Sequence, residues 1–370
     1  MELVSSMLLG NLVENFGDQV TAAAIRPAMR RRFSKASAGA SGGLHWKADR
    51  AWARFFDYPR TVAQLSSNFE LFHILDHSYA HLANYLPAER VIVTCHDLDA
   101  FRCLLEPDKE SRSLPFRLMT RRILRGLRRA AWITCDSEAT RRAVLEHRLF
   151  PPARLSVVHN GVHPAFSPQG NGSADEEVTR LLRRASGELP ELLHVGSTIA
   201  RKRIDVLLQI FASLRQILPT MRLLRVGGDF TADQASMARR LGIREAIDVL
   251  PRLTPQLLAS VYRRASLLLQ PSESEGFGLP VVEAMACGTP VVASDIPALR
   301  EVGGDAAVFC PLTDVHGWVR TCIGLLEAKT RDPQRDSSRR ALCLKRSQQF
   351  CWTEYARRMV EIYERVAHQC

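Results

Sequence analysis

Two glutamates flank a glycine-rich turn in the stretch SESEGFGLPVVEAMACGTPVVASD, which spans residues 272–295. Glu275 lies in the turn, and Glu283 follows in the first turns of an expected helix. Carboxylates at such positions can accept hydrogen bonds from the hydroxyls of a bound sugar and ribose. Gly276 and Gly278 carry no side chain that would keep a ligand away from the backbone. From spacing alone, a solvated Glu275 and a Glu283 that only complements the helix N-terminus are equally acceptable.

The elements around this turn form a strand–loop–helix–strand unit. The apolar run ASLLLQPS (265–272) predicts a buried strand, residues 279–287 predict a helix that Gly288 can end, and PVVAS (290–294) predicts the next strand. Ligands of open parallel sheets bind beyond the carboxyl ends of strands. A helix that begins there directs N–H groups and partial positive charge at them, which suits a diphosphate.

A second loop of the same kind carries cations. Lys202, with Arg201 beside it, lies in HVGSTIARKRIDVLL (194–208), between an expected strand and an expected helix. A cation near a helix start opposes the helix dipole, so an anionic ligand explains Lys202 better than a solvated surface position does.

Strand and helix patterns alternate along the chain, which predicts an α/β protein with doubly wound parallel sheets. The expected strands are residues 19–25, 71–75, 90–95, 130–136, 155–160, 191–197, 222–228, 247–251, 265–272 and 290–294. The expected helices include residues 116–130, 138–147, 203–217, 232–241, 255–263 and 279–287.

The length of 370 residues is enough for two domains. We place the boundary at HNGVHPAF, so that residues 1–162 form the first domain and residues 163–352 the second. The polar segment 168–180 resembles a surface loop that leads into a helix. Residues 353–370 predict a helix that packs back on the first domain, with an apolar stripe at Tyr355, Met359, Ile362, Tyr363 and Val366.

Composition narrows the class of protein further. Hydrophobic residues make up 46% and charged residues 24%, and no apolar run approaches the ~20 residues that span a bilayer. Nine cysteines without metal-ligand spacing favour reduced thiols in a cytoplasmic protein. The net charge of +11 favours anionic partners, but no nucleic-acid motif accompanies it.

The turn that contains the glutamates closely resembles the E-x7-E signature of the group 1 retaining glycosyltransferases (glycosyltransferase family 4). That resemblance implies a GT-B fold, in which two Rossmann-like domains face each other across a cleft. It also implies that Glu275 contacts the sugar of a nucleotide-diphosphate donor and that Glu283 contacts the ribose. No metal or other cofactor is implied.

Other stretches resemble the same family in the same order. Around Lys202 the family supplies a basic residue to the donor diphosphate, and Ser197 stands where it often has arginine, a contact that Arg201 or Arg203 could replace. RVGGD and LPRL lie where the family packs the base and ribose, at Gly227, Gly228, Arg252 and Leu253. The implied donor-binding residues are Ser197, Arg201, Lys202, Gly276, Phe277, Gly278, Leu279 and Glu283.

The first domain has histidines and aspartates at two strand ends. In VTCHDLDAF, His96 follows a strand, and Asp76 and His77 follow the strand LFHIL. The resemblance makes these three residues, with Glu275, candidates for the catalytic cleft. His73 alternates inward within its strand and is expected in the core. A structural role for each isolated histidine stays open.

The helix around residues 116–132 is basic and amphipathic. Its arginines at 121, 122, 125, 128 and 129 could face an anionic membrane or a phosphorylated acceptor, or simply solvent. We therefore expect a cytoplasmic protein, with peripheral contact at the inner membrane face as one option.

The first strand and glycine-rich turn of the family's first domain have no counterpart here. The chain begins with a helix whose apolar face includes Leu3, Met7, Leu8 and Leu12, and residues 19–25 would then form the second strand. Our hypothesis is that the natural start lies upstream of Met1. A sheet rearranged around the loss is the alternative.

The resemblance thus implies an enzyme that moves a hexose from a nucleotide-diphosphate sugar to a hydroxyl, with retention. The acceptor would be a glycan, lipid-linked or a small molecule. Two rivals stay open: a catalytically weak nucleotide-binding or assembly subunit of glycosyltransferase descent, and a GT-B phosphorylase, against which the missing pyridoxal-phosphate lysine motif counts.

Overall fold

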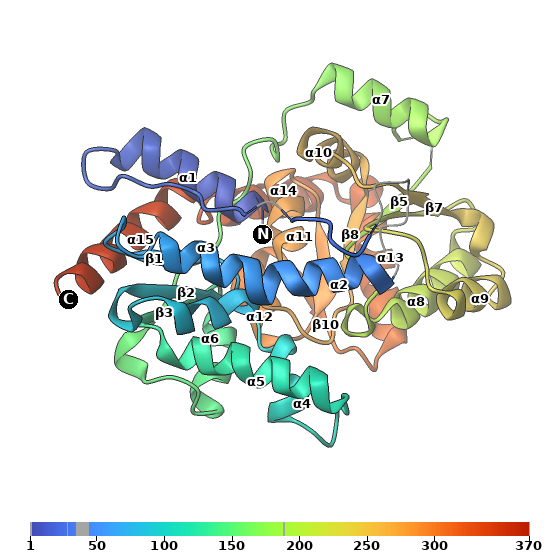
Figure 1. Ribbon diagram of the computed structural model, residues 1–370. Helices are drawn as coiled ribbons and strands as arrows, with labels where there is room; N and C mark the ends of the chain where they lie inside the picture. Colours follow the sequence, from blue (N-terminus) through green and yellow to red (C-terminus); the bar gives the residue numbers. More distant parts are fainter. Residues whose placement is uncertain (1, 28, 35–43, 188, 370) are drawn as a thin grey trace. The chain divides into compact units, whose positions relative to one another are not determined.

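The computed structural model describes residues 2–27, 29–34, 44–187 and 189–369 (Figure 1). It divides into two compact units. The N-terminal unit comprises Met1–His159 with Thr353–Cys370, and the C-terminal unit comprises Asn160–Trp352. No described helix is both long and apolar enough to cross a membrane.

The N-terminal unit is built on a parallel sheet with the order β1-β2-β3-β4. Its strands are β1 (Phe72–Ile74), β2 (Val91–Cys95), β3 (Trp132–Cys135) and β4 (Leu155–Val157). Its α-helices are α1 (Glu2–Phe16), α2 (Leu44–Trp52), α3 (Tyr58–Gln64), α4 (Arg102–Leu105), α5 (Leu114–Arg129), α6 (Glu138–Glu146) and α15 (Trp352–Ala367). A π-helical turn, η1 (Ala53–Asp57), joins α2 to α3, and 3-10 segments include η2 (His77–Tyr85).

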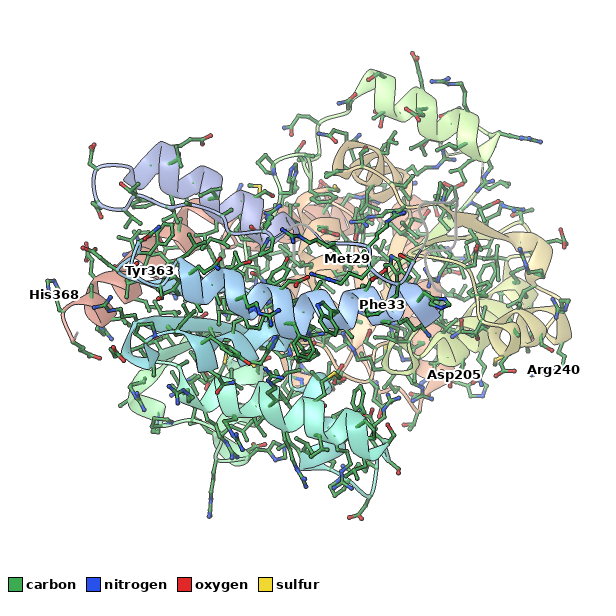
Figure 2. All side chains as sticks on the ribbon, viewed as in Figure 1. Met29, Phe33, Asp205, Arg240, Tyr363 and His368 are labelled. Carbon is green, nitrogen blue, oxygen red and sulfur yellow. The ribbon has the colours of Figure 1, made fainter. Side chains whose placement is uncertain are left out.

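Both faces of this sheet are covered by helices. On one face, Val91, Val93 and Ile133 join a core with Ile123 and Leu127 of α5. On the other, His73 of β1 bonds Tyr363 of α15, which Figure 2 labels. The expected stripe of α15 is buried at all five positions: Tyr355, Met359, Ile362, Tyr363 and Val366.

The strand expected at residues 19–25 is wrong. These residues follow α1 without regular secondary structure, and none of them is buried. The run contains three consecutive alanines, whose strand propensity is low and whose side chains offer little area to bury. The average hydrophobicity of this run is therefore not sufficient to predict a strand. The expected N-terminal helix is confirmed as α1.

The C-terminal unit has a six-stranded parallel sheet with the order β10-β9-β8-β5-β6-β7. Its strands are β5 (Glu191–Val195), β6 (Arg222–Val226), β7 (Ile247–Leu250), β8 (Leu267–Gln270), β9 (Val291–Ser294) and β10 (Val308–Cys310). Its helices are α7 (Gly172–Leu182), α8 (Ile204–Ile217), α9 (Ala232–Arg240), α10 (Pro255–Arg264), α11 (Leu279–Ala286), α12 (Pro297–Gly303), α13 (Val315–Arg331) and α14 (Pro333–Ser347).

Alternate residues of the strands pack into two separate hydrophobic cores, one on each face of the sheet, as a doubly wound sheet requires. Leu193, Leu224 and Leu268 pack with α7, α10, α11 and α12 on one face. Leu192, Leu223 and Leu267 pack with α8, α9 and α13 on the other. The doubly wound α/β expectation is confirmed in this unit. Strand β10 was not expected, because only three residues pair at the sheet edge.

Candidate functional site

The strand order places a topological switch point between β5 and β8. Both lie at the centre of the sheet, and the chain runs outward from them in opposite directions, through β6 and β7 or through β9 and β10. Loops that follow such a pair of strands diverge and leave a crevice at their carboxyl ends. The loop after β5 carries Arg201 and Lys202, and the loop after β8 carries Glu275. The fold therefore brings together the two loops that the sequence singled out.

An ion pair joins these loops. The Lys202 Nζ donates to Oε1 of Glu275 at 2.5 Å, and Nη1 of Arg201 donates to Oε2 at 3.0 Å. The backbone N–H of Glu273 also donates to the carbonyl oxygen of Arg201 at 2.7 Å. Side chains of Lys202 and Glu275 are 9% and 6% exposed, so the pair is largely shielded from water.

Two further donors hold the Glu275 carboxylate. Gln270 Nε2 lies 2.8 Å and Ser272 Oγ 2.7 Å from its Oε1. Burial alone would raise the pKa of Glu275, but the Lys202 ammonium, the Ser272 hydroxyl and the Arg201 guanidinium hold it below its ordinary value. The carboxylate is therefore a fixed anion, oriented by four side chains. Sequence reasoning missed Gln270 and Ser272, although both polar residues end an otherwise apolar strand.

The turns after β5 and β6 touch through glycine. Gly227 has a φ of 125°, and a Cβ at this position would lie 2.0 Å from the carbonyl oxygen of Gly196. Only glycine permits this approach. Gly228 also has positive φ but faces open space, and Ser197 lies in the same loop as Gly196. The expected base region therefore contains two glycines with different steric roles.

Glu283 is buried within α11. Its Oε2 accepts a hydrogen bond from the Tyr262 hydroxyl of α10 at 2.7 Å. Burial raises the pKa of Glu283 to about 7, while the bond from Tyr262 acts in the opposite direction. The sequence led us to expect an open carboxylate that faces a crevice. The structure shows instead a shielded group with one oxygen bonded to a tyrosine.

Several other residues named from the motif serve the fold. Phe277 is buried in the core against Phe350, with ring centroids 5.5 Å apart, and Leu279 packs against the same core. Gly278 adopts φ of 105° directly before α11, and a Cβ there would meet Leu299 at 2.7 Å. The side chain of Phe277 therefore belongs to the core, and its expected contact with the donor stays a prediction that its backbone would have to fulfil.

The remaining cations and base-region residues lie at the edge of the site. Arg203 is paired with Asp205, labelled in Figure 2, at 2.8 Å, and its expected replacement of an arginine at position 197 stays a prediction. Arg252 is exposed after β7, while Leu253 is partly buried against the core. Gly276 lies in the loop between Glu275 and α11.

The N-terminal unit holds a second polar cluster, at the carboxyl ends of β1, β2 and β3. His96 Nδ1 lies 2.5 Å from Oδ2 of Asp136, and its Nε2 lies 2.7 Å from the carbonyl oxygen of Leu75. Burial lowers the pKa of His96, but the Asp136 carboxylate and the Leu75 carbonyl outweigh it and raise the pKa to about 9. Both ring nitrogens are thus occupied, and His96 is a charged, fixed imidazolium.

His77 lies beside this ion pair. The backbone N–H of His96 donates to its Nδ1 at 3.3 Å, and its Nε2 lies 3.7 Å from Oδ1 of Asp97. Burial lowers the pKa of His77. Asp76 caps η2 by accepting from the N–H of Ser78 at 2.8 Å. Asp97, with a side chain 28% exposed, is open to solvent, whereas that of Asp136 is 4% exposed.

Sequence reasoning named His96, His77 and Asp76 of this cluster but did not name Asp97 or Asp136 as site residues. Asp97 directly follows His96, and Asp136 ends the strand run AAWITCD, so their strand-end positions were the available signal. His73 pairs with Thr94 and Tyr363 inside the sheet, which agrees with its expected core position. In the part of the chain that the structure describes, no group of three or more metal-ligating side chains gathers.

Two family models match the chain, one for each half. Residues 9–166 match Glycosyltransferase Family 4, and residues 182–341 match Glycosyl transferases group 1. The second match contains Lys202, Glu275 and Glu283, and the first contains the cluster around His96. The chain belongs to the group 1 glycosyltransferases, and its two parallel-sheet units form a GT-B fold.

Curated relatives include D-inositol 3-phosphate glycosyltransferases. The protein of that name from Rhodococcus erythropolis is 32% identical over 234 residues, which cover 60% of this chain and 51% of the relative. The one from Mycobacterium sp. strain KMS is 36% identical over 187 residues, which cover 47% and 40%. The chain therefore spans about half the length of the curated relatives that it matches.

Solved structures share the fold at lower identity. Anabaena HepE in complex with UDP and glucose has a TM-score of 0.67 at 17% identity, covering 84% of this chain and 82% of that one. Sucrose-phosphate synthase from Thermosynechococcus elongatus has a TM-score of 0.66 at 21% identity, covering 88% and 77%. At these identities the likeness concerns the fold.

Proposed function

We propose that the protein transfers a hexose from a nucleotide-diphosphate sugar to an acceptor hydroxyl, with retention of the anomeric configuration. The observation that carries this proposal is the meeting of Lys202, Arg201 and Glu275 at the switch point of a doubly wound sheet. The family supports the reaction class. Structures of HepE with UDP and with UDP-glucose support this donor class by fold analogy.

The cations at the switch point suit a leaving diphosphate. As the bond from the anomeric carbon to the phosphate oxygen breaks, its electron pair stays on the diphosphate, and Lys202 and Arg201 stabilise that charge. The acceptor oxygen forms the new bond to the anomeric carbon, and its proton passes to the departing phosphate oxygen. This scheme requires no metal ion or other cofactor, because side chains and the start of α11 supply the positive charge. Glu275 binds the sugar hydroxyls.

The cluster in the N-terminal unit fits a role with hydroxyl groups. Asp97 can accept a hydrogen bond from a sugar or acceptor hydroxyl, and His77 can donate from the nitrogen that faces it. His96, bonded through both nitrogens, positions these groups by joining the ends of β1, β2 and β3. The residue that contacts substrate is therefore Asp97 or His77 in this proposal, with His96 behind it.

Titration with UDP and GDP, followed by a donor-turnover assay, tests the proposed activity. We expect binding of one nucleotide, release of that nucleotide from its sugar conjugate, and a product with the anomeric configuration of the donor. Nucleotide binding without turnover of any tested sugar conjugate would favour the assembly-subunit alternative. Absence of binding to both nucleotides would contradict the proposal.

We also propose that α5 contacts an anionic membrane surface. Arg121, Arg125, Arg128 and Arg129 are exposed on one face of α5, without an ion-pair partner among the described residues. Leu114 and Leu118, 66% and 54% exposed, continue that face toward the start of the helix. Each arginine near an anionic membrane surface contributes ~1 kcal/mol to the free energy of binding. This basic and apolar face is typical of helices that lie in the membrane interface.

Vesicle sedimentation separates this contact from a merely solvated helix. Arg121→Glu with Arg125→Glu should reduce binding to phosphatidylserine-containing vesicles at least ~10-fold. Arg239→Glu with Arg240→Glu on α9 makes the same charge change at another exposed site and should retain most of the binding. If both variants lost vesicle binding equally, binding would depend only on the net charge of the protein, which would contradict a specific role for α5.

A further inference from the structure

Two fully buried polar side chains face each other beneath the phosphate-side loops of the C-terminal unit. His194 of β5 is paired in register with Arg225 of β6, near the carboxyl ends of both strands. Both residues are 0% exposed. In-register neighbours of a parallel sheet direct their side chains to the same face, so the two form one buried layer.

This layer has few hydrogen-bond partners. Nη1 of Arg225 donates to the carbonyl oxygen of Val226 at 2.7 Å. Among the described residues, Nε and Nη2 of Arg225 and both ring nitrogens of His194 have none. Burial lowers the pKa of Arg225 to about 10, so it remains charged at neutral pH. Among the residues that the structure describes, no carboxylate forms an ion pair with Arg225.

Three half-buried arginines of this unit each have a carboxylate partner, unlike Arg225. Arg264 and Arg184 share the carboxylate of Glu191, at 2.5 and 2.7 Å, and Arg222 is held by Asp248 at 2.8 Å. Glu191, Arg222 and Asp248 lie on β5, β6 and β7 themselves, nearer the opposite end of the sheet. An uncompensated buried charge destabilises a fold unless something else offsets it. Arg225 is therefore an exception within its own sheet.

Arg225 and His194 lie directly behind Lys202. A Cβ on Gly196 would lie 3.4 Å from Cε1 of His194 and 3.5 Å from Cε of Lys202. A Cβ on Gly227 would lie 3.1 Å from Nη1 of Arg225. The turns after β5 and β6 thus pack on all three side chains.

The shielded side chains around these turns carry more positive than negative charge. Arg201, Lys202 and Arg225 are cationic, and Glu275 is the carboxylate that the first two share. Asp229 and Glu273 of the same loops are exposed to solvent, which screens their charges. Burial holds the pKa of His194 well below its ordinary value, and the charges of Arg225 and Lys202 lower it further. A ligand with two or more negative charges at this turn would offset the excess.

We propose that Arg225 is a positioning residue whose buried charge is compensated by the diphosphate of the bound ligand, so that it selects nucleoside diphosphates over uncharged nucleosides. The inference rests on the proposed function, because it takes the anion site at the switch point as given. Arg225 does not touch the ligand. It acts through the field at the Gly196–Gly227 turns, and its burial keeps that field from being screened by water and salt.

Calorimetric titration of Arg225→Met with UDP and with uridine tests this role, or with GDP and guanosine if the protein binds GDP. In Arg225→Met we expect the affinity for the diphosphate to fall about tenfold, which is the order expected when one unit charge is lost at an effective dielectric of ~20. The affinity for the uncharged nucleoside should stay unchanged. The ligand-free variant should unfold at the wild-type temperature or above it, because a buried unpaired charge has been removed. A purely structural role would lower both affinities together.

Two further variants complete the experiment. Arg225→Lys should retain most of the diphosphate affinity, whereas Arg225→Gln should lose it like the methionine variant. Arg215→Met is the matched control. It removes an arginine of α8 that donates to the backbone carbonyl of Met221, and it should bind UDP normally. Unchanged UDP affinity in Arg225→Met would contradict the inference and would leave Arg225 with a purely structural role. Failure of the methionine and glutamine variants to fold would also contradict the inference, since the ligand-free protein should not need the charge. A wild-type protein that binds neither UDP nor GDP would instead overturn the proposed function.

Discussion

The ammonium of Lys202 lies 2.5 Å from the carboxylate of Glu275, although the two residues are in loops that follow different strands of the sheet. In the structure each satisfies the other. A bound diphosphate sugar would bring both an anion for Lys202 and hydroxyls for Glu275. The pair is thus a preformed arrangement in which a cation and a hydroxyl acceptor already lie within hydrogen-bonding distance of each other.

Replacing Glu275 by glutamine should abolish most of the transfer activity and also destabilise the protein. The substitution leaves Lys202 buried without its carboxylate, which costs about 3 kcal/mol of unfolding free energy. Sugar transfer should fall by ~100-fold or more, because the fixed acceptor of hydroxyl groups is lost. Glu327→Gln, which breaks an exposed pair with Arg331 on α13, is the control and should cost below ~1 kcal/mol. Near-normal turnover in Glu275→Gln would remove this residue from the site.

Alanine substitutions at two adjacent glycines should differ in their effect. Gly227 and Gly228 both have positive φ, so each alanine incurs a backbone cost of about 1 kcal/mol. At Gly227 alone, the new Cβ would also clash with the carbonyl oxygen of Gly196. Denaturant unfolding should show Gly227→Ala as the less stable variant by at least ~2 kcal/mol. Equal stabilities would mean that the turns after β5 and β6 do not meet as described.

The buried Glu283 should make the ligand-free protein more stable in mild acid. Its folded-state pKa of about 7 exceeds the ordinary value of 4.5, so the folded state binds the proton more tightly than the unfolded state. Its contribution therefore becomes unfavourable as the pH rises from about 4.5 through about 7, by about 3 kcal/mol in total. The stability difference between Glu283→Gln and wild type should grow over this range. A difference that is independent of pH would show that Glu283 is solvated.

The His96–Asp136 pair should give a pH dependence of the same sign, in a higher pH range. The folded-state pKa of His96, about 9, lies above its ordinary value of 6.5, so its stabilisation is complete below about pH 6.5 and is lost as the pH rises through 9. NMR titration of the His96 ring should report this value directly. In Asp136→Asn the pKa should fall below 6.5, because burial then dominates. A wild-type value near 6.5 would mean that the two side chains do not form an ion pair.

Strands were predictable where short runs of large apolar residues are bounded by polar residues. VIVTC and LLLQ became β2 and β8 because burial on both faces of a parallel sheet selects such sequences. The alanine-rich run at 19–25 shares the hydrophobicity but not the side-chain area. The π-helical turn η1 and the edge strand β10 have no local signature of this kind.

The sequence was sufficient to predict the types of residue in the candidate site, but not which of them contact one another. The sequence singled out Lys202 and Glu275 separately, and only the strand order β8-β5-β6 brings their loops together. The family resemblance named Phe277 among the donor-binding residues, whereas its side chain, in the turn before α11, packs in the core against Phe350. The buried state of Glu283 and the unpaired Arg225 depend on neighbouring elements, which no local pattern reports.

Calorimetric titration of Lys202→Met tests most directly whether the switch-point loops bind an anionic donor. Lys329→Met, at the end of α13, removes the same charge from another part of the C-terminal unit and serves as the control. The account predicts at least ~10-fold weaker binding of UDP or GDP by Lys202→Met, with wild-type affinity in Lys329→Met. Equal affinity of both variants and wild type for the nucleotide diphosphate would contradict a phosphate-binding role of the Lys202–Glu275 arrangement.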